Sequence, residues 1–201
     1  MKSDILLYSD SKKDRGSKVR WLLAEMNLEY ETVSRSNVPP PGYSALNPFE
    51  SLPTVTVKGA TFFESSAILL YLADLYSERQ LAPVISSPDR PVYLQWMVFS
   101  EATLDRALEK LWAAEEIPGA GTTENIHKLR QDVQDVFHGL EISLQGRQYI
   151  LGDRFSAADI SLAYYLNWAE SESLLEGFPK TRNYLLRMKD RPAAQMIGLF
   201  G

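Results

Sequence analysis

The chain has 201 residues, of which 45% are hydrophobic and 23% charged, and its formal net charge is −5. A folded chain of this length buries about 70% of the surface that its unfolded form exposes. Its ordinary composition excludes a disordered tail and a low-complexity scaffold. No basic face accompanies the acidic balance, so we expect no nucleic-acid partner. The absence of cysteine excludes disulfides, thiolate metal sites and a cysteine nucleophile.

We expect no targeting segment at the beginning of the chain. The apolar run Ile5–Tyr8 is followed directly by polar residues, whereas a signal peptide needs a longer apolar stretch. No window approaches the ~18 uncharged apolar residues of a membrane span. We therefore expect a cytoplasmic protein with no membrane partner.

The first 78 residues alternate extended and helical patterns. A short apolar run indicates a buried strand, and after residue 17 apolar side chains recur at helical spacing. The expected elements are a strand at 5–8, a helix from 17, a strand at 28–33, a loop at 39–42, a hairpin of strands at 54–57 and 61–63, and a helix at 65–76. This order predicts a small α/β domain over residues 1–78.

Residues 79–90 form the expected linker, because prolines and serines interrupt the regular patterns there. Beyond it the periodic segments are helical, with apolar stripes at 93–111, 133–144, 160–168 and 185–188 and a break at 118–121. The sequence therefore predicts an all-helical domain over residues 91–201.

A proline directly precedes the strand expected at 54–57. Pro53 cannot donate to a sheet ladder. If the Leu52–Pro53 bond is cis, the main chain of Leu52 turns outward and can pair with a peptide-like ligand. The alternative is a trans proline that starts an edge strand.

Capping patterns occur at the starts of two expected helices. At the first, we expect Ser65 to cap a helix whose first-turn N–H groups attract a carboxylate. Glu64 beside it would attract an ammonium group, so the junction suits an amino-acid-like zwitterion, with plain capping as the alternative. The second, at 155–160, predicts a capping box of Ser156 and Asp159, which serves folding.

Taken in order, these features resemble the glutathione transferase family over essentially the whole chain. The matching segments are 19–25, 47–53, 64–68 and 152–160. The resemblance implies a thioredoxin-like N-terminal domain, an all-helical C-terminal domain and a homodimer. It also implies glutathione as co-substrate.

The resemblance assigns glutathione-binding roles residue by residue. The main chain of Leu52 before a cis Pro53 would bind the tripeptide backbone. Glu64 would pair with the γ-glutamyl ammonium group, and Ser65 would hold the γ-glutamyl carboxylate. Ser51 can hydrogen-bond the glycyl end.

The catalytic position departs from the family pattern. Many members place a Ser or Cys about six residues before the Val-Arg pair, where this chain has Lys13. The chemistry requires a glutathione thiolate, and nearby cations lower a thiol pKa of ~8.5. We expect Arg15 and Lys13 to stabilise the thiolate, with Ser11 or Tyr8 as hydroxyl donor. The alternative is a solvated surface turn of charges.

By the same resemblance, the pocket for a second substrate lies between the domains, against the long helix that begins at residue 91. Its candidate residues are Phe49, Arg106, Leu108 and Trp112. The short C-terminal end predicts an open cleft and a bulky substrate. No cluster at ligand spacing indicates a metal.

Two classes of function follow. The first is a glutathione transferase that attacks a mostly apolar electrophile in detoxification or secondary metabolism, with a glutathione-dependent isomerase as a variant. The second is a non-catalytic relative that acts through protein–protein contacts, which the lysine at position 13 and the acidic Glu50 favour. A thiol reductase is disfavoured, because its usual nucleophile is a cysteine.

Overall fold

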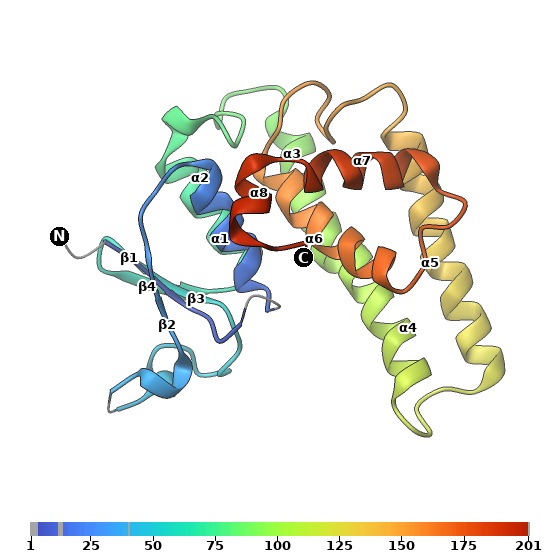
Figure 1. Cartoon of the computed structure of the whole chain (residues 1–201), viewed down its shortest axis with the longest axis horizontal. Coiled ribbons are helices and arrows are strands. Elements are labelled where there is room, and N and C mark those ends of the chain that lie inside the picture. Colours follow the sequence, from blue (N-terminus) through green and yellow to red (C-terminus); the bar gives the residue numbers. More distant parts are fainter. Residues whose placement is uncertain (1–3, 12–13, 40, 201) are drawn as a thin grey trace. The chain divides into compact units, whose positions relative to one another are not determined.

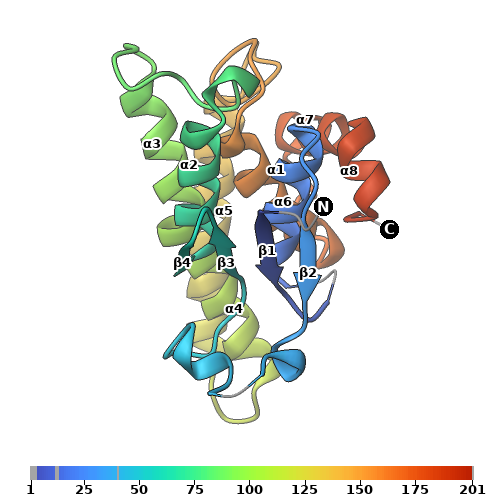
Figure 2. The ribbon, with the colours of Figure 1, turned by 90° about the vertical axis from the view of Figure 1, so that its left-hand side faces the viewer.

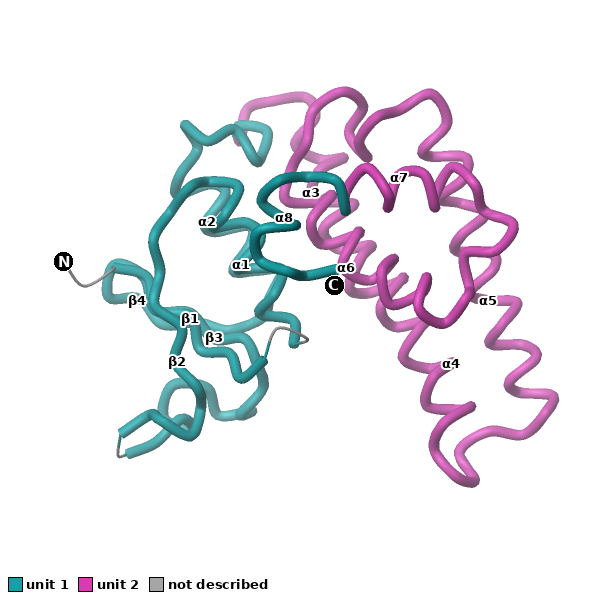
Figure 3. Tube along the Cα trace, in the orientation of Figure 1, with its two compact units in different colours: residues 1–84, 189–201 teal, residues 85–188 magenta. Residues whose placement is uncertain are grey.

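The computed structural model of the chain describes residues 4–11, 14–39 and 41–200. The chain divides into two compact units, coloured separately in Figure 3. The first unit comprises Met1–Val84 and Lys189–Gly201, and the second comprises Ile85–Met188.

The first unit is built on a four-stranded mixed sheet with the order β2-β1-β3-β4. The strands are β1 (Ile5–Tyr8), β2 (Glu31–Val33), β3 (Thr54–Val57) and β4 (Ala60–Phe63). β1 pairs parallel with β2 and antiparallel with β3, and β3 and β4 form a hairpin. This is a thioredoxin-like sheet, as expected.

Two helices of the first unit, α1 (Gly16–Glu25) and α2 (Ser65–Leu75), pack against each other beside the sheet (Figures 1 and 2). Three short 3-10 helices lie in its loops: η1 (Arg35–Asn37), η2 (Tyr43–Ala45) and η3 (Ser77–Arg79).

The strand expected at 28–33 is shorter than predicted and begins at Glu31. The reason is the end of α1. Asn27 adopts a positive φ of 52°, and the N–H groups of Asn27 and Leu28 donate to the carbonyls of Ala24 and Leu23 at 3.0 Å. This pattern closes a helix through its last carbonyls, so the backbone at 27–28 completes α1 and does not enter the sheet.

The second unit is helical throughout its regular segments. The helices are α3 (Arg90–Phe99), α4 (Arg106–Glu116), α5 (Thr123–Ser143), α6 (Ala157–Ser171) and α7 (Pro179–Lys189), whose last residue belongs to the first unit. A π-helical segment, η4 (Ser100–Asp105), joins α3 to α4. The apolar stripe at 93–111 therefore follows one continuous helical path through all three. No helix in the described part of the chain is long and apolar enough to cross a membrane.

The predicted capping box at the start of α6 is confirmed. The carboxylate of Asp159 accepts hydrogen bonds from the N–H groups of Ile150 and Ser156, both at 2.8 Å, and from the Tyr184 hydroxyl at 2.8 Å. Burial raises the pKa of Asp159 in spite of these hydrogen bonds, and burial together with the nearby Asp159 raises the pKa of Tyr184 well above its usual value.

Residues 189–201 belong to the first compact unit. A short helix, α8 (Pro192–Ile197), packs against α1. The Arg191 guanidinium binds the Glu25 carboxylate through two contacts of 2.7 and 2.8 Å, and the rings of Trp21 and Phe200 meet edge-on at 5.4 Å. Six residues are too few for a helical period to be recognised in the sequence.

Candidate functional site

The loop before β3 is held around a buried asparagine. The side-chain amide of Asn47 donates to the carbonyl of Ser51 at 2.9 Å and to the Thr54 hydroxyl at 3.2 Å. Its carbonyl oxygen accepts from the N–H of Phe49 at 3.0 Å, and the Tyr43 hydroxyl donates to the same Ser51 carbonyl at 2.7 Å. The loop therefore enters β3 in one fixed path.

The Leu52–Pro53 peptide bond at the end of this loop is cis, as the resemblance implies. Leu52 is half-buried and lies outside the sheet pairing, which begins at Thr54. Within the described ranges no residue hydrogen-bonds to the N–H or C=O of Leu52. Both groups are thus open to a peptide-like ligand, while the carbonyl of Ser51 is already occupied.

The start of α2 differs in one detail from the prediction. Glu64, not Ser65, occupies the cap position, and neither side chain caps the helix. Ser65 is the first helical residue and is 4% exposed, and its hydroxyl has no recorded partner among the residues described. The first N–H groups of α2 point out of the helix here, where a carboxylate is favoured.

Glu64 has a backbone conformation that is costly for a residue with a side chain. Its φ is 73° and its ψ 109°, and its side chain is exposed and makes no ion pair within the described part of the chain. Such a conformation costs of order 1–3 kcal/mol and persists where the surroundings impose it. Glu64 and Ser65 therefore supply a carboxylate and a hydroxyl at neighbouring positions of the chain, at the start of α2.

The β1–α1 loop is organised by an aspartate that sequence reasoning did not single out. The Asp14 carboxylate accepts hydrogen bonds from the N–H groups of Asp10, Ser11 and Gly16 at 2.8–3.0 Å. The Ser9 hydroxyl donates to the same carboxylate at 2.7 Å. A side chain at Gly16 would meet the Asp14 carboxylate at 2.6 Å, so only glycine admits this approach.

A buried arginine closes the same network. The guanidinium of Arg20, 9% exposed, donates to the Ser9 hydroxyl at 2.6 Å and to the carbonyl of Ser11 at 2.8 Å. The only signal of this network in the sequence is Arg20 itself, within the first-helix motif. We name Ser9, Asp14 and Arg20 the loop clip.

The four predicted catalytic residues have different surroundings. Tyr8 is buried at the end of β1, with its ring 5.9 Å from that of Tyr43. Ser11 is exposed in the loop, and Arg15 is the half-buried cap residue of α1. Lys13 lies outside the described residues.

The four residues predicted for a substrate pocket separate into two sets. Leu108 and Trp112, on α4, line a cavity of about 210 Å³ within the second unit. Arg106 is exposed, lies 3.8 Å from Glu109 and does not line this cavity. Phe49, in the first unit, is 75% exposed and touches Phe63 edge-on at 5.6 Å.

A thioredoxin-like unit with a cis Leu52–Pro53 bond before β3, followed by a helical unit, defines the class of protein to which the chain belongs. Residues 16–75 match the model of the glutathione S-transferase N-terminal domain, and residues 100–187 match that of the C-terminal domain. Together the two matches cover more than half of the chain. The chain belongs to the glutathione transferase family.

Individual relatives agree with this assignment at low identity. Glutathione S-transferase 3 of Schizosaccharomyces pombe is 26% identical, with 92% of this chain and 83% of the relative covered. Disulfide-bond oxidoreductase YfcG of Escherichia coli is 25% identical, with 89% and 87% covered. Among solved structures, a glutathione transferase of Burkholderia graminis with two glutathione molecules bound per subunit is 27% identical, has a TM-score of 0.82, and covers 96% of this chain and 86% of its own.

Proposed function

We propose that the protein binds glutathione in its first unit and transfers it to an electrophilic small molecule. The observation that carries this proposal is the junction of β4 and α2, where Glu64 and Ser65 are adjacent and neither side chain has a hydrogen bond or ion pair within the described residues. The strained backbone at Glu64 supports a role in binding, because it has no evident role in folding.

Each part of glutathione has a matching group in this proposal. The Glu64 carboxylate pairs with the γ-glutamyl ammonium group, and the Ser65 hydroxyl and the first N–H groups of α2 bind the γ-glutamyl carboxylate. The open main chain of Leu52 pairs with the cysteinyl backbone. Ser51 would reach the glycyl end.

The β1–α1 loop would stabilise the thiolate of bound glutathione. We propose that the positive charges of Arg15 and Lys13 lower the thiol pKa from ~8.5, with Ser11 or Tyr8 as hydroxyl donor. The sulfur then attacks the electrophilic carbon, a new carbon–sulfur bond forms, and the leaving group departs with its bonding pair.

Calorimetric titration of glutathione tests the binding step. We expect Glu64→Ala and Ser65→Ala each to weaken binding by at least about tenfold, because each removes a group that pairs with a charged end of the ligand. Glu31→Ala, an exposed glutamate of β2, is the matched control and should leave affinity unchanged. The absence of any heat of binding with wild type at high millimolar glutathione would refute the proposal.

The thiolate is tested separately. The ultraviolet absorbance of bound glutathione thiolate, followed against pH, gives the pKa of the bound thiol. We expect this pKa to rise in Arg15→Ala and in Lys13→Ala while glutathione still binds. An unchanged value in both variants would remove these residues from the mechanism.

One relative favours a second candidate, reduction of a disulfide by glutathione, because it is named a disulfide-bond oxidoreductase. This chain has no cysteine, so every thiol would come from glutathione. Two glutathione molecules would give oxidised glutathione and a reduced dithiol. Formation of oxidised glutathione during reduction of a model disulfide, without conjugation of glutathione to an electrophile, would favour this candidate.

We also propose that the protein is a cytoplasmic homodimer. Phe49 is 75% exposed on the first unit, and a second copy would cover this ring. Sedimentation of wild type and Phe49→Ser measures this directly: a dimer that the substitution weakens is expected, and a monomeric wild type would refute it.

A further inference from the structure

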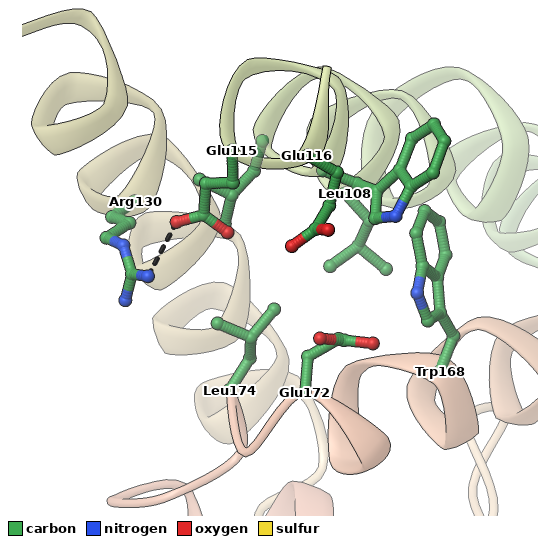
Figure 4. Close-up of a pocket in the computed structure, with 9 residues that line it drawn as sticks. Leu108, Glu115, Glu116, Arg130, Trp168, Glu172 and Leu174 are labelled. Carbon is green, nitrogen blue, oxygen red and sulfur yellow. Dashed lines mark ion pairs between the residues drawn. The ribbon is translucent and has the colours of Figure 1, made fainter. Parts of the chain in front are cut away.

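A cavity of about 210 Å³ lies within the second unit, where the C-terminal parts of α4 and α6 face the side of α5 (Figure 4). Its apolar wall comprises Leu108, Leu111, Leu174 and the indoles of Trp112 and Trp168. A space of this size holds about seven water molecules or one small organic molecule. Trp112 is 47% exposed, so its ring is available to a ligand.

The polar part of the lining is acidic. Three carboxylates line the cavity, those of Glu115, Glu116 and Glu172, with one guanidinium, that of Arg130. Arg130 pairs with Glu115 at 2.6 Å. Glu116 and Glu172 are in no ion pair within the described ranges, so the lining carries a net charge of −2, three carboxylates less one guanidinium.

The two unpaired carboxylates face the same space. Figure 4 shows Glu116 and Glu172 extending into the cavity from opposite sides, with Trp168 alongside and the Arg130–Glu115 pair away from them. They come from different helices, since Glu116 ends α4 and Glu172 follows α6. A ligand between them would contact two carboxylates and at least one indole at once.

This lining selects by charge. An anion is repelled, and a neutral apolar ligand would cover two carboxylates without pairing them, which costs free energy. An organic cation gains from both, because an indole face and a carboxylate each attract an ammonium group. A bare metal ion does not fit, because hard cations take six or more oxygen ligands and no acidic cluster able to hold a metal occurs among the described residues.

We propose that this cavity binds a small organic cation, an ammonium or quaternary ammonium group carried on a compact apolar body. The inference does not rest on the proposed function. Binding itself requires the second unit alone.

Tryptophan fluorescence with defined probes tests the proposal on the full chain. Benzyltrimethylammonium is the cation, neopentylbenzene its neutral isostere and benzoate the anion. We expect the cation to bind at least tenfold more tightly than either of the others. Glu116→Gln and Glu172→Gln should each weaken cation binding at least about fivefold, and Trp168→Phe should weaken it as well.

The control is Glu176→Gln, an exposed glutamate four residues beyond Glu172 that does not line the cavity. It should leave cation affinity unchanged. Equal affinity for the neutral isostere, no binding of the cation, or full affinity in both cavity variants would overturn the inference. Glutathione titrated into the same samples reports on the proposed function separately, so a failed cation site with intact glutathione binding refutes the inference alone.

Discussion

Removal of the Asp14 carboxylate should lower the free energy of unfolding of the first unit, because the loop clip loses the hydrogen bonds that this carboxylate accepts. In Asp14→Ala, the part-buried N–H of Gly16 and the hydroxyl of buried Ser9 lose their acceptor. The exposed N–H groups of Asp10 and Ser11 can turn to water. Each part-buried group left unpaired costs about 1–2 kcal/mol, which gives about 2–4 kcal/mol in total for the two groups.

The buried Arg20 guanidinium adds to this cost, because Asp14 is the carboxylate near it, 3.9 Å away. For a chain of this size, about 2–4 kcal/mol corresponds to a fall in melting temperature of roughly 5–15 °C. Urea unfolding measures the change directly. Asp4→Ala, an exposed aspartate before β1, is the matched control and should stay within about 0.5 kcal/mol of wild type.

The same substitution should also raise the pKa of bound glutathione thiol, because the loop that carries Ser11 and Arg15 loses its fixed path. If Asp14→Ala matches the control in stability, the hydrogen bonds of the loop clip carry no net free energy and the reasoning fails. If it is destabilised but the thiol pKa is unchanged, the clip serves folding alone.

Three further predictions concern single residues. Glu64→Gly and Glu64→Ala should lose glutathione affinity equally. In urea unfolding, the free energy of unfolding should be about 1 kcal/mol higher for the glycine variant than for the alanine variant, because glycine relieves the strain of φ 73°. Equal free energies of unfolding would contradict the strain. Asp159→Ala should lower the free energy of unfolding by about 3–5 kcal/mol, because buried N–H groups and the Tyr184 hydroxyl lose their acceptor, whereas Tyr184→Phe should cost only about 1 kcal/mol. Burial raises the pKa of Asp10 but hydrogen bonds from Arg35 outweigh it, so the pKa lies below its usual value. Asp10 therefore stabilises the fold above the unfolded pKa of about 3.9 and ceases to do so as pH falls through the lower folded value. The stability difference between wild type and Asp10→Asn should shrink from pH 6 toward pH 3 in urea titrations, and a difference that grows would reverse the sign.

Local patterns predicted the backbone of two short segments well. Leu52–Pro53 and Glu64–Ser65 are each neighbours in the sequence, so their residue types and the elements that flank them were enough to indicate an open main chain and a charged helix start. The error at Ser65 was one position, because Glu64 takes a positive φ that no pattern in the sequence announces.

Features that depend on distant residues were not predicted. Arg20 donates to Ser11 and Ser9, which are nine and eleven residues earlier in the chain. Trp168 of α6 lines the same cavity as residues of α4. These contacts follow from packing, which periodicity does not encode. The same holds for α8, which is recognised only through its contact with α1.

The return of the last residues to the first unit has a consequence for synthesis. A ribosome makes the chain from its N-terminus, and domains generally fold in that order. Here α1 contacts a segment that is made after the second unit, because Glu25 and Trp21 pack against Arg191 and Phe200. The first unit is therefore started before the second unit and completed after it. A gene fragment ending after residue 84 would encode its sheet without the segment that closes it.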